Sequence, residues 1–310
     1  MEYRHETVLL QPTVAALVKN PDGIYVDCTV GGGGHAAAVA RLLSAAAILI
    51  GIDQDPAALV AAKERIGVPA CRVELIRDNF RNLRSILRRL SIPEVDGILM
   101  DLGASSVHFD NPSRGFSYMQ DGPLDMRMDP AGPVLAADIV NKYSEDELTR
   151  VFFEFGEEKW ARQIARRIVA TRQEHRITRT GELVEIIKES IPAAARRHGP
   201  HPAKRVFQAL RIEVNQELDA LQQALQDAID CLKPGGKICV ITFHSLEDRI
   251  VKQLFRDLSK KCHCPPQTPI CICGAKPKLQ TAGKAIIPSP EEVERNPRSR
   301  SAKLRIAVRI

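Results

Sequence analysis

The sequence predicts an α/β fold, in which a Rossmann-like sheet of parallel strands is interrupted by an inserted helical domain. Apolar runs alternate with helical stretches from Ile24 to Gly103, as they do in parallel sheets covered by helices. A glycine-rich turn, Gly31–Gly34, follows the first apolar run and opens into a helix-favouring stretch. A long helical region then separates this alternating part from the last apolar runs of the chain.

Each apolar run in the first third of the chain has the length of a buried strand. We expect strands at Ile24–Val30, Ile48–Asp53, Arg72–Asp78 and Gly97–Leu102, and helices between them at His35–Leu43, Pro56–Ile66 and Leu83–Leu90. Because strands and helices alternate, the strands should run parallel and the helices should cover both faces of the sheet.

The alternation stops at Asp110–Pro133, which has the Gly-, Pro- and Asp-rich composition of a long irregular loop. Helices are expected next at Glu145–Phe155, Glu157–Arg172, Arg179–Glu189 and Val206–Leu232, the first begun by a capping box of Ser144 and Glu147. Strand character returns at residues 237–243 and 304–310, with a helix ending near Leu258 between them. We therefore expect a discontinuous sheet domain, residues 1–110 and 216–310, and an inserted loop and helical domain, residues 111–215.

The composition is that of a soluble globular protein with a sizeable core. Of the 310 residues, 44% are hydrophobic and 26% are charged, and the formal net charge is +6. No stretch reaches the ~18 apolar residues that span a bilayer, and the first residues lack the apolar core of a signal peptide. Eight cysteines without an export signal favour a reducing compartment, so we expect a cytoplasmic protein.

The glycine-rich turn predicts a nucleotide-binding βαβ unit, and two acidic residues indicate its cofactor. The spacing Gly31-x-Gly33-x-x-Ala36 also fits a dinucleotide site, but Asp27 just ahead of it would repel a pyrophosphate. The same carboxylate attracts the cationic methionine end of S-adenosyl-L-methionine (SAM). Asp53 ends the next strand, where a carboxylate can accept both ribose hydroxyls. The alternative is that both acids are solvated strand ends.

Polar residues end all four of the first strands. They are Asp27, Asp53, the run Asp78-Asn79-Phe80, and Asp101. Ligands of open α/β sheets bind outside the carboxyl ends of the strands, so these residues predict one crevice. Phe80 either lies against an adenine ring there or is a rim aromatic of the core.

The insertion carries the excess of positive charge. Between Glu157 and Arg211 there are thirteen Lys and Arg against six Glu, a surplus of seven, which exceeds that of the whole chain. Arg196-Arg197-His198, Lys204-Arg205 and the arginines from Arg162 to Arg179 suit contacts with nucleic-acid phosphates. The alternative is a solvated, salt-bridged helix face.

Two Cys-x-Cys pairs, Cys262/Cys264 and Cys271/Cys273, lie near the end of the chain. Four thiolates can hold a tetrahedral zinc, although Cys-x-x-Cys spacing is more usual in such sites. Free thiols in a proline-braced loop are the alternative, and we assign no metal ligand from the sequence.

Eight stretches carry a family resemblance: His5–Leu10, Gly31–His35, Asp101–Ser106, Arg114–Met119, Asp121–Met128, Phe207–Arg211, Phe243–Arg249 and Asn296–Ser301. Together they resemble the bacterial ribosomal RNA small-subunit methyltransferase H family (RsmH, formerly MraW), in the family's order and over nearly the whole chain. The run Asp121–Met128 is highly specific. The late return of the chain to the sheet edge is compatible with the seven-stranded sheet of class I SAM-dependent methyltransferases.

The resemblance implies SAM-dependent methylation of the exocyclic N4 amine of a cytidine in the decoding (P-site) region of 16S rRNA, and hence the 30S ribosomal subunit as partner. By position, the family's cofactor residues fall on Gly33, Gly34, His35, Asp53, Phe80, Asp101 and His108. At His108 the family usually has glutamine, and Val107 replaces the common proline. An imidazole can still donate or accept a hydrogen bond.

Asp101 is the expected catalytic residue, because amino-methyltransferases place a polar, substrate-facing motif at the end of this strand. Its carboxylate or neighbouring carbonyls would accept hydrogens of the target amine, whereas a purely cofactor-holding role is the alternative. The base must leave its stack to react. Phe116, Tyr118 and Asp121-Gly122-Pro123 either line its pocket or only shape their loop.

Three other functions each fit part of the sequence. A DNA amino-methyltransferase would have an Asp/Asn-Pro-Pro-aromatic motif where Asp101-Leu102-Gly103 stands. A nicotinamide-dependent oxidoreductase fits the glycines but is opposed by Asp27. A non-catalytic RNA-binding module fits the basic insertion alone.

Overall fold

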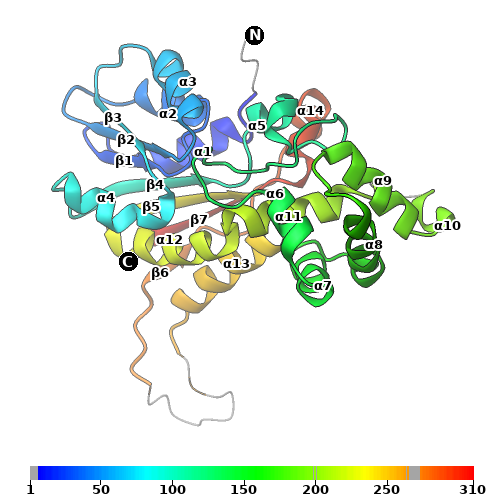
Figure 1. Ribbon diagram of the computed structural model, residues 1–310. Helices are drawn as coiled ribbons and strands as arrows, with labels where there is room; N and C mark the ends of the chain where they lie inside the picture. The colour runs from blue at the N-terminus through cyan, green and yellow to red at the C-terminus, as the bar shows by residue number, and fades with distance from the viewer. Residues whose placement is uncertain (1–5, 198, 200, 263, 265–272) are drawn as a thin grey trace. The chain divides into compact units, whose positions relative to one another are not determined.

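The computed structural model describes residues 6–197, 199, 201–262, 264 and 273–310, so His5, His198 and Cys271 lie outside the described residues. Its strands form one sheet in the order β3-β2-β1-β4-β5-β7-β6 (Figure 1). Their bounds are β1 Ile24–Asp27, β2 Ile48–Asp53, β3 Arg72–Arg77, β4 Val95–Asp101, β5 Leu232–Thr242, β6 Leu279–Thr281 and β7 Lys303–Arg309. Strands β1 to β5 pair in parallel, and β7 is antiparallel to β5 and β6. The class I methyltransferase sheet expected from the sequence is confirmed.

The chain divides into two compact units. The first contains the described residues up to Gly103 and from Asp219 onward, and the second is Ala104–Leu218. The sheet and its helices make up the first unit, which we call the sheet unit. The second contains most of the remaining helices, and we call it the helical unit.

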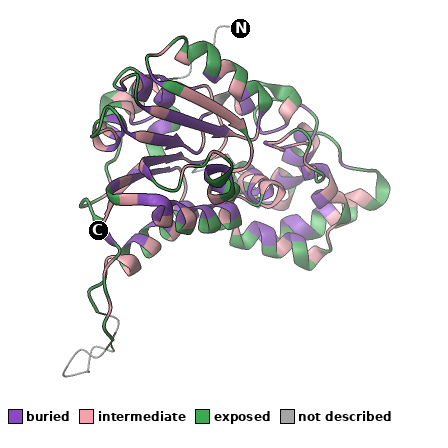
Figure 2. Ribbon diagram, turned by 90° about the vertical axis from the view of Figure 1, so that its left-hand side faces the viewer, coloured by how far each residue is buried: buried purple, intermediate pink, exposed green. Residues whose placement is uncertain are grey.

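Helices cover both faces of the sheet because successive strand residues point to opposite sides. On one face, Tyr25, Leu49 and Leu99 pack in a core with α1 (Leu10–Leu17), α2 (Gly34–Ala40) and α3 (Pro56–Ile66). On the other, their neighbours Val26 and Ile50 pack with α4 (Leu83–Arg89), α12 (Glu217–Cys231) and α13 (Ser245–Leu258). Figure 2 shows the central strands as mostly buried.

The helical unit has its own core, formed where the apolar faces of its helices meet. Its helices are α5 Ser106–Asp110, α6 Ala136–Lys142, α7 Glu145–Glu154, α8 Ala161–Glu174, α9 Thr180–Ser190, α10 Ala193–Arg196 and α11 Lys204–Asn215. The capping box predicted for α7 is confirmed. The Ser144 hydroxyl accepts from the Glu147 N–H at 3.2 Å, and the Glu147 carboxylate accepts from the Ser144 N–H at 2.7 Å.

The single long helix expected over Val206–Leu232 is wrong, because the chain breaks at Gln216. That residue has a φ of +49°, which ends α11 before α12 begins. Within the helical unit, the Asn215 amide is held by the backbone of Met126 and Met128. These long-range bonds, rather than any helix-breaking residue, fix the end of α11.

Several short elements were not predicted from the sequence. They are α1, α5, α6, β6, α14 (Pro290–Arg295) and the 3-10 turns η1 (Phe80–Asn82), η2 (Pro112–Arg114) and η3 (Pro297–Ser301). Apart from α1 and α6, they are too short to show a clear hydrophobic period. Within the described part of the chain, every helix is too short or too polar to cross a bilayer.

Candidate functional site

Asp27 is the last residue of β1, at the carboxyl edge of the sheet. Its side chain is only 3% exposed, and one carboxylate oxygen accepts a 3.1 Å hydrogen bond from the Thr29 N–H. Burial raises the pKa of Asp27 to about 7, against the lowering effects of His35 and of that hydrogen bond. A cation bound beside Asp27 would favour the ionised form of this carboxyl group and would be attracted to it.

Asp53, the last residue of β2, holds the glycine-rich turn. Its two carboxylate oxygens each accept a backbone N–H at 2.9 Å, one from Gly31 and the other from Asp55. Gly31 has a φ of +49°, so the bond fixes a left-handed turn that suits glycine.

Gly33 and Gly34 are required by packing inside the sheet unit. A Cβ atom on Gly33 would lie 2.8 Å from the Cα of Ala62 in α3. A Cβ atom on Gly34 would lie 1.8 Å from the Thr7 hydroxyl oxygen. Because these two residues have no side chains, the start of α2 can pack closely against Ala62 and Thr7. This packing brings the start of the helix close to the sheet edge.

Asp101, the last residue of β4, lies beside His35 of α2. The His35 Nδ1 and Asp101 Oδ2 atoms are 3.5 Å apart, and the Asp101 N–H donates to the Thr29 hydroxyl at 2.6 Å. Burial lowers the pKa of His35, but the hydrogen bond and charge of Asp101, with Asp27 adding to them, outweigh burial and raise it.

Two atoms of this pair mark a polar ligand site. Among the described residues, His35 Nε2 and Asp101 Oδ1 are buried side-chain atoms without a hydrogen-bond partner. Leaving such atoms unpaired costs about 1–3 kcal/mol each. A polar ligand at this edge of the sheet would remove that cost.

Two residues separate Phe80, which begins η1, from the end of β3, and Asn79, the residue before Phe80, fixes this turn. The Asn79 side chain accepts from the Arg81 N–H and donates to the Gln54 side chain, each at 3.0 Å. Because Gln54 follows the end of β2, this amide ties the two strand ends together. Phe80 is half-buried and packs against the core on the α4 face.

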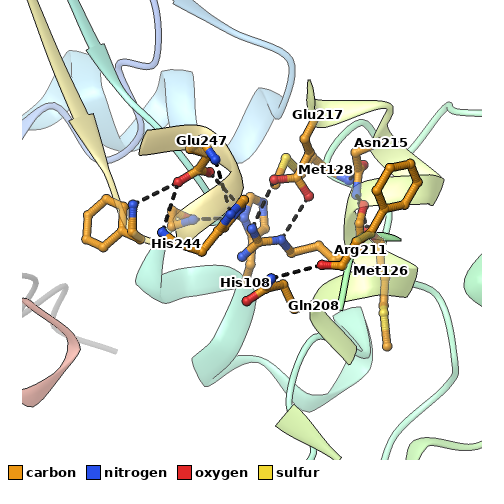
Figure 3. A network of polar contacts seen from close by, with 12 residues as sticks. His108, Met126, Met128, Gln208, Arg211, Asn215, Glu217, His244 and Glu247 are labelled. Atoms are coloured by element: carbon orange, nitrogen blue, oxygen red, sulfur yellow. Dashed lines mark hydrogen bonds and ion pairs between the residues drawn. The ribbon is translucent and has the colours of Figure 1, made fainter. Parts of the chain in front are cut away.

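The turn from β5 into α13 adds two further polar side chains to the same edge (Figure 3). Glu247 is 2% exposed and accepts from the Phe243 N–H at 2.8 Å. Its other carboxylate oxygen lies 3.0 Å from His244 Nε2. Asp101 and Ile241 are paired in register, so this turn follows the strand next to β4.

Thr29 and Glu247 are two polar residues of this edge that were not predicted from the sequence. Thr29 lies past the end of β1, and its bond to Asp101 spans 72 residues, so no local pattern reveals it. Glu247 has the Glu of a capping box, but an imidazole stands at the N-cap position where Ser, Thr, Asp or Asn is usual. A search for capping boxes that allowed His at the N-cap would have found it.

Six of the seven expected cofactor residues lie in the sheet unit: Gly33, Gly34, His35, Asp53, Phe80 and Asp101. His108 lies on α5 in the helical unit and is not placed with them. Its ring stacks on Phe116 with centroids 4.8 Å apart, and its Nδ1 atom accepts from the Ser105 N–H at 3.2 Å.

The loop of residues 111–128 is fixed inside the helical unit by α11. Asn215 accepts from the Met128 N–H at 2.7 Å and donates to the Met126 carbonyl at 2.8 Å (Figure 3).

Arg211 makes a two-point ion pair with Glu217, at 2.8 and 3.0 Å, where both side chains are largely buried. The guanidinium group of Arg211 therefore has a structural role in joining α11 to Glu217.

Three residues expected near the target base differ in their surroundings. Phe116 is buried in the core of the helical unit, and Asp121 is paired with Arg179 and bonded to the Gly181 N–H. These contacts shape the loop. Tyr118 stacks on His201 with centroids 4.8 Å apart and stays partly exposed, so only its ring offers a surface.

The basic residues of the helical unit fall into two groups. Several are neutralised: Arg167 pairs with Glu189, Arg176 with Asp138 and Arg179 with Asp121. By contrast, Arg196, Arg197 and Lys204 are exposed and have no ion-pair partner among the described residues. We call these three the unpaired basic set. Lys159 and Arg162, near the start of α8, are likewise exposed and without an ion-pair partner in the described part of the chain. The uncompensated positive charge therefore lies at the start of α8 as well as around α10 and the start of α11.

The sequence profile of the MraW methylase family matches residues 2–310. The chain belongs to the MraW methylase family. Its relatives include ribosomal RNA small subunit methyltransferase H of Brevibacillus brevis, 53% identical over 311 residues that cover 100% of this chain and 99% of that protein. The protein of the same name from Clostridioides difficile is 50% identical and covers 100% of both chains.

A solved structure titled as a putative rRNA-methylase from Clostridium thermocellum aligns with 99% of both chains, at 13% identity and a TM-score of 0.44. Because this similarity is low, the fold of this MraW family member is assigned from its own strand order. Membership of a methylase family supports SAM as the cofactor and removes the oxidoreductase alternative.

Proposed function

We propose that this enzyme transfers a methyl group from SAM to the exocyclic N4 amine of one cytidine in the decoding (P-site) region of 16S rRNA, in the 30S subunit and in the cytoplasm. The observation that carries the proposal is the buried group of Asp27, His35 and Asp101 at the carboxyl edge of the sheet. Family membership and the printed names of the relatives support the RNA substrate.

The residues at this edge fit the parts of SAM. Asp53 would accept from the ribose hydroxyls, Phe80 would lie against the adenine, and Asp27 would face the cationic methionine end. Gly33, Gly34 and His35 place the start of α2 against the cofactor. His108 lies on α5 in the helical unit, where its ring stacks on Phe116, and its contact with the cofactor stays a prediction.

SAM supplies an electrophilic methyl group when bound, and the chemistry left to the protein is proton handling and orientation. The lone pair of the cytidine amine is delocalised into the ring, so the amine is a weak nucleophile. Asp101 would accept a hydrogen bond from the amine, localise its lone pair and take up the proton as the new bond forms. His35, 3.5 Å from the Asp101 carboxylate, would hold it in place.

The helical unit would supply RNA affinity through its unpaired basic set. Exposed cations without carboxylate partners can replace the counterions of a phosphate backbone, whereas paired arginines have less to gain. Tyr118 offers an aromatic ring on which an unstacked base can lie. The target base must leave its stack before its amine can be methylated.

The test is methylation by the untagged protein with labelled SAM and one of three substrates: free 16S rRNA, 30S particles or duplex DNA. We expect N4-methylcytidine in the RNA, identified by mass spectrometry of the digested nucleosides, and no label in DNA. Label in DNA alone would establish a DNA amino-methyltransferase instead. Methylation at carbon 5 or at an oxygen would overturn the proposed chemistry.

A further inference from the structure

Three thiols come together in the segment between α13 and β6. The segment leaves α13 after Leu258 and returns at Lys278, whose N–H donates to the Leu258 carbonyl at 2.8 Å. Its described parts extend away from the sheet in Figure 1. The sulfur atoms of Cys262, Cys264 and Cys273 all lie within 4.8 Å of one another.

The distance between two of the sulfur atoms is compatible with a metal site. The Cys262 and Cys273 sulfur atoms are 3.8 Å apart. A tetrahedral zinc with Zn–S bonds of about 2.3 Å separates its sulfur ligands by about 3.8 Å, whereas a disulfide requires about 2.05 Å. These two residues are eleven positions apart, so sequence neighbourhood alone does not bring their sulfur atoms together.

The local backbone supports the same arrangement. The Cys264 N–H donates to the Cys262 sulfur at 3.3 Å, which orients that sulfur as a hydrogen bond to a metal ligand would. Gly274 has a φ of +59°, with open space where a Cβ would be, so the chain turns sharply after Cys273.

These cysteines differ from the others that the structure describes. Cys28, Cys71, Cys231 and Cys239 are buried and act as small apolar residues of the core. Cys262 and Cys273 are exposed, and Cys264 is half-exposed. Burial therefore does not explain why three cysteines lie together in an exposed segment.

We infer that Cys262, Cys264 and Cys273 bind a zinc ion as thiolates and that the metal fixes the segment between α13 and β6. Zinc suits this site because it takes thiolate ligands in tetrahedral geometry and stays redox-inert in a reducing compartment. The ion would stabilise a long segment that has no helix or strand among its described residues. Its position outside the SAM-binding edge makes it structural.

The first test measures metal directly in the untagged, full-length protein. Zinc content by mass spectrometry should be close to one ion per chain after purification under reducing conditions. Replacing zinc with Co²⁺ should give the intense thiolate-to-metal charge-transfer absorption of a multi-thiolate site. A protein that binds neither metal, or a cobalt complex without thiolate absorption, overturns the inference.

Variants then assign the ligands. Cys262→Ser, Cys264→Ser and Cys273→Ser should each lower zinc affinity by about tenfold or more, because a hydroxyl is a poor zinc ligand. Cys71→Ala, which changes a buried cysteine elsewhere in the sheet unit, is the matched control and should keep the metal. Circular dichroism and SAM binding verify that each variant is folded, and wild-type affinity in the three serine variants would overturn the assignment.

Discussion

Asp27 should couple SAM binding to pH, because its carboxyl group is half-protonated near neutrality. Burial raises its pKa from 3.8 to about 7, and the cationic end of SAM would favour the ionised form. Below pH 7 a growing share of the protein must lose this proton before the cation can bind. The SAM dissociation constant of the wild-type protein should therefore rise towards tenfold per pH unit as the pH falls below 7.

The raised pKa of Asp27 also makes the free energy of unfolding depend on pH. A folded pKa above the unfolded value means that the folded protein binds the extra proton between pH 3.8 and about 7. The stabilising contribution is complete below this window and is lost as the pH rises through it. About three pKa units correspond to about 4 kcal/mol, so Asp27→Asn should stabilise the cofactor-free protein at pH 8 by up to that amount and change little at pH 4.

Isothermal calorimetry between pH 5.5 and 7 tests the binding part, because the amino group of SAM remains protonated there. Asp27→Asn should bind SAM more weakly at pH 7 and lose most of the pH dependence. The titratable groups that shift the pKa of Asp27 are His35, Asp101 and Asp53, and Cys28 next to it stays protonated because burial raises the pKa of its thiol well above the usual range. Since the His35 pKa is raised and its protonation also repels a cation, His35→Gln is the necessary control. Equal pH slopes in Asp27→Asn and the wild type would refute the assignment.

Three further changes separate cofactor binding, RNA binding and catalysis. Asp53→Ala removes two backbone hydrogen bonds as well as the ribose acceptor, so it should weaken SAM binding by about 1–3 kcal/mol in calorimetry and also lower the melting temperature. Replacing the unpaired basic set with Ala should flatten the slope of log RNA affinity against log salt concentration. The control Arg167→Ala removes an arginine that is paired with Glu189 and should change this slope less. Equal changes of slope would contradict the distinction between paired and unpaired basic residues. Asp101→Asn should lower single-turnover methylation at saturating SAM by about 10²–10⁴-fold with RNA affinity unchanged, and an unchanged rate with weaker SAM binding would make Asp101 a cofactor ligand only.

Elements with a strong local signal were predictable from the sequence. Pro56–Ile66 begins with Pro at its first position and has the bounds that the structure shows, because local propensity and tertiary packing agree there. Residues 204–231 show the opposite case. Asn215, Gln216 and Glu217 interrupt no helical pattern, and only the bonds from Asn215 to the loop of residues 111–128 reveal why the helix ends.

The site was predictable in its position but not in its physical state. Strand ends at Asp27, Asp53 and Asp101 follow from the alternation of apolar runs. The sequence does not show that His35 lies 3.5 Å from Asp101, because 66 residues separate them along the chain. It also does not show that Gly34 must be glycine to accommodate Thr7.

The buried polar group of Asp27, His35 and Asp101 at the sheet edge is best explained by a ligand, because these residues destabilise the protein when no ligand is bound. Asp27 is held largely protonated up to about pH 7, and His35 and Asp101 each carry a buried atom without a partner among the described residues. Apolar residues of similar volume would fill the same space at lower cost. Such a group is retained where binding returns the lost free energy. A cation facing Asp27 and an amine donating to Asp101 would satisfy both acids, and these are the chemical features of SAM and of cytidine.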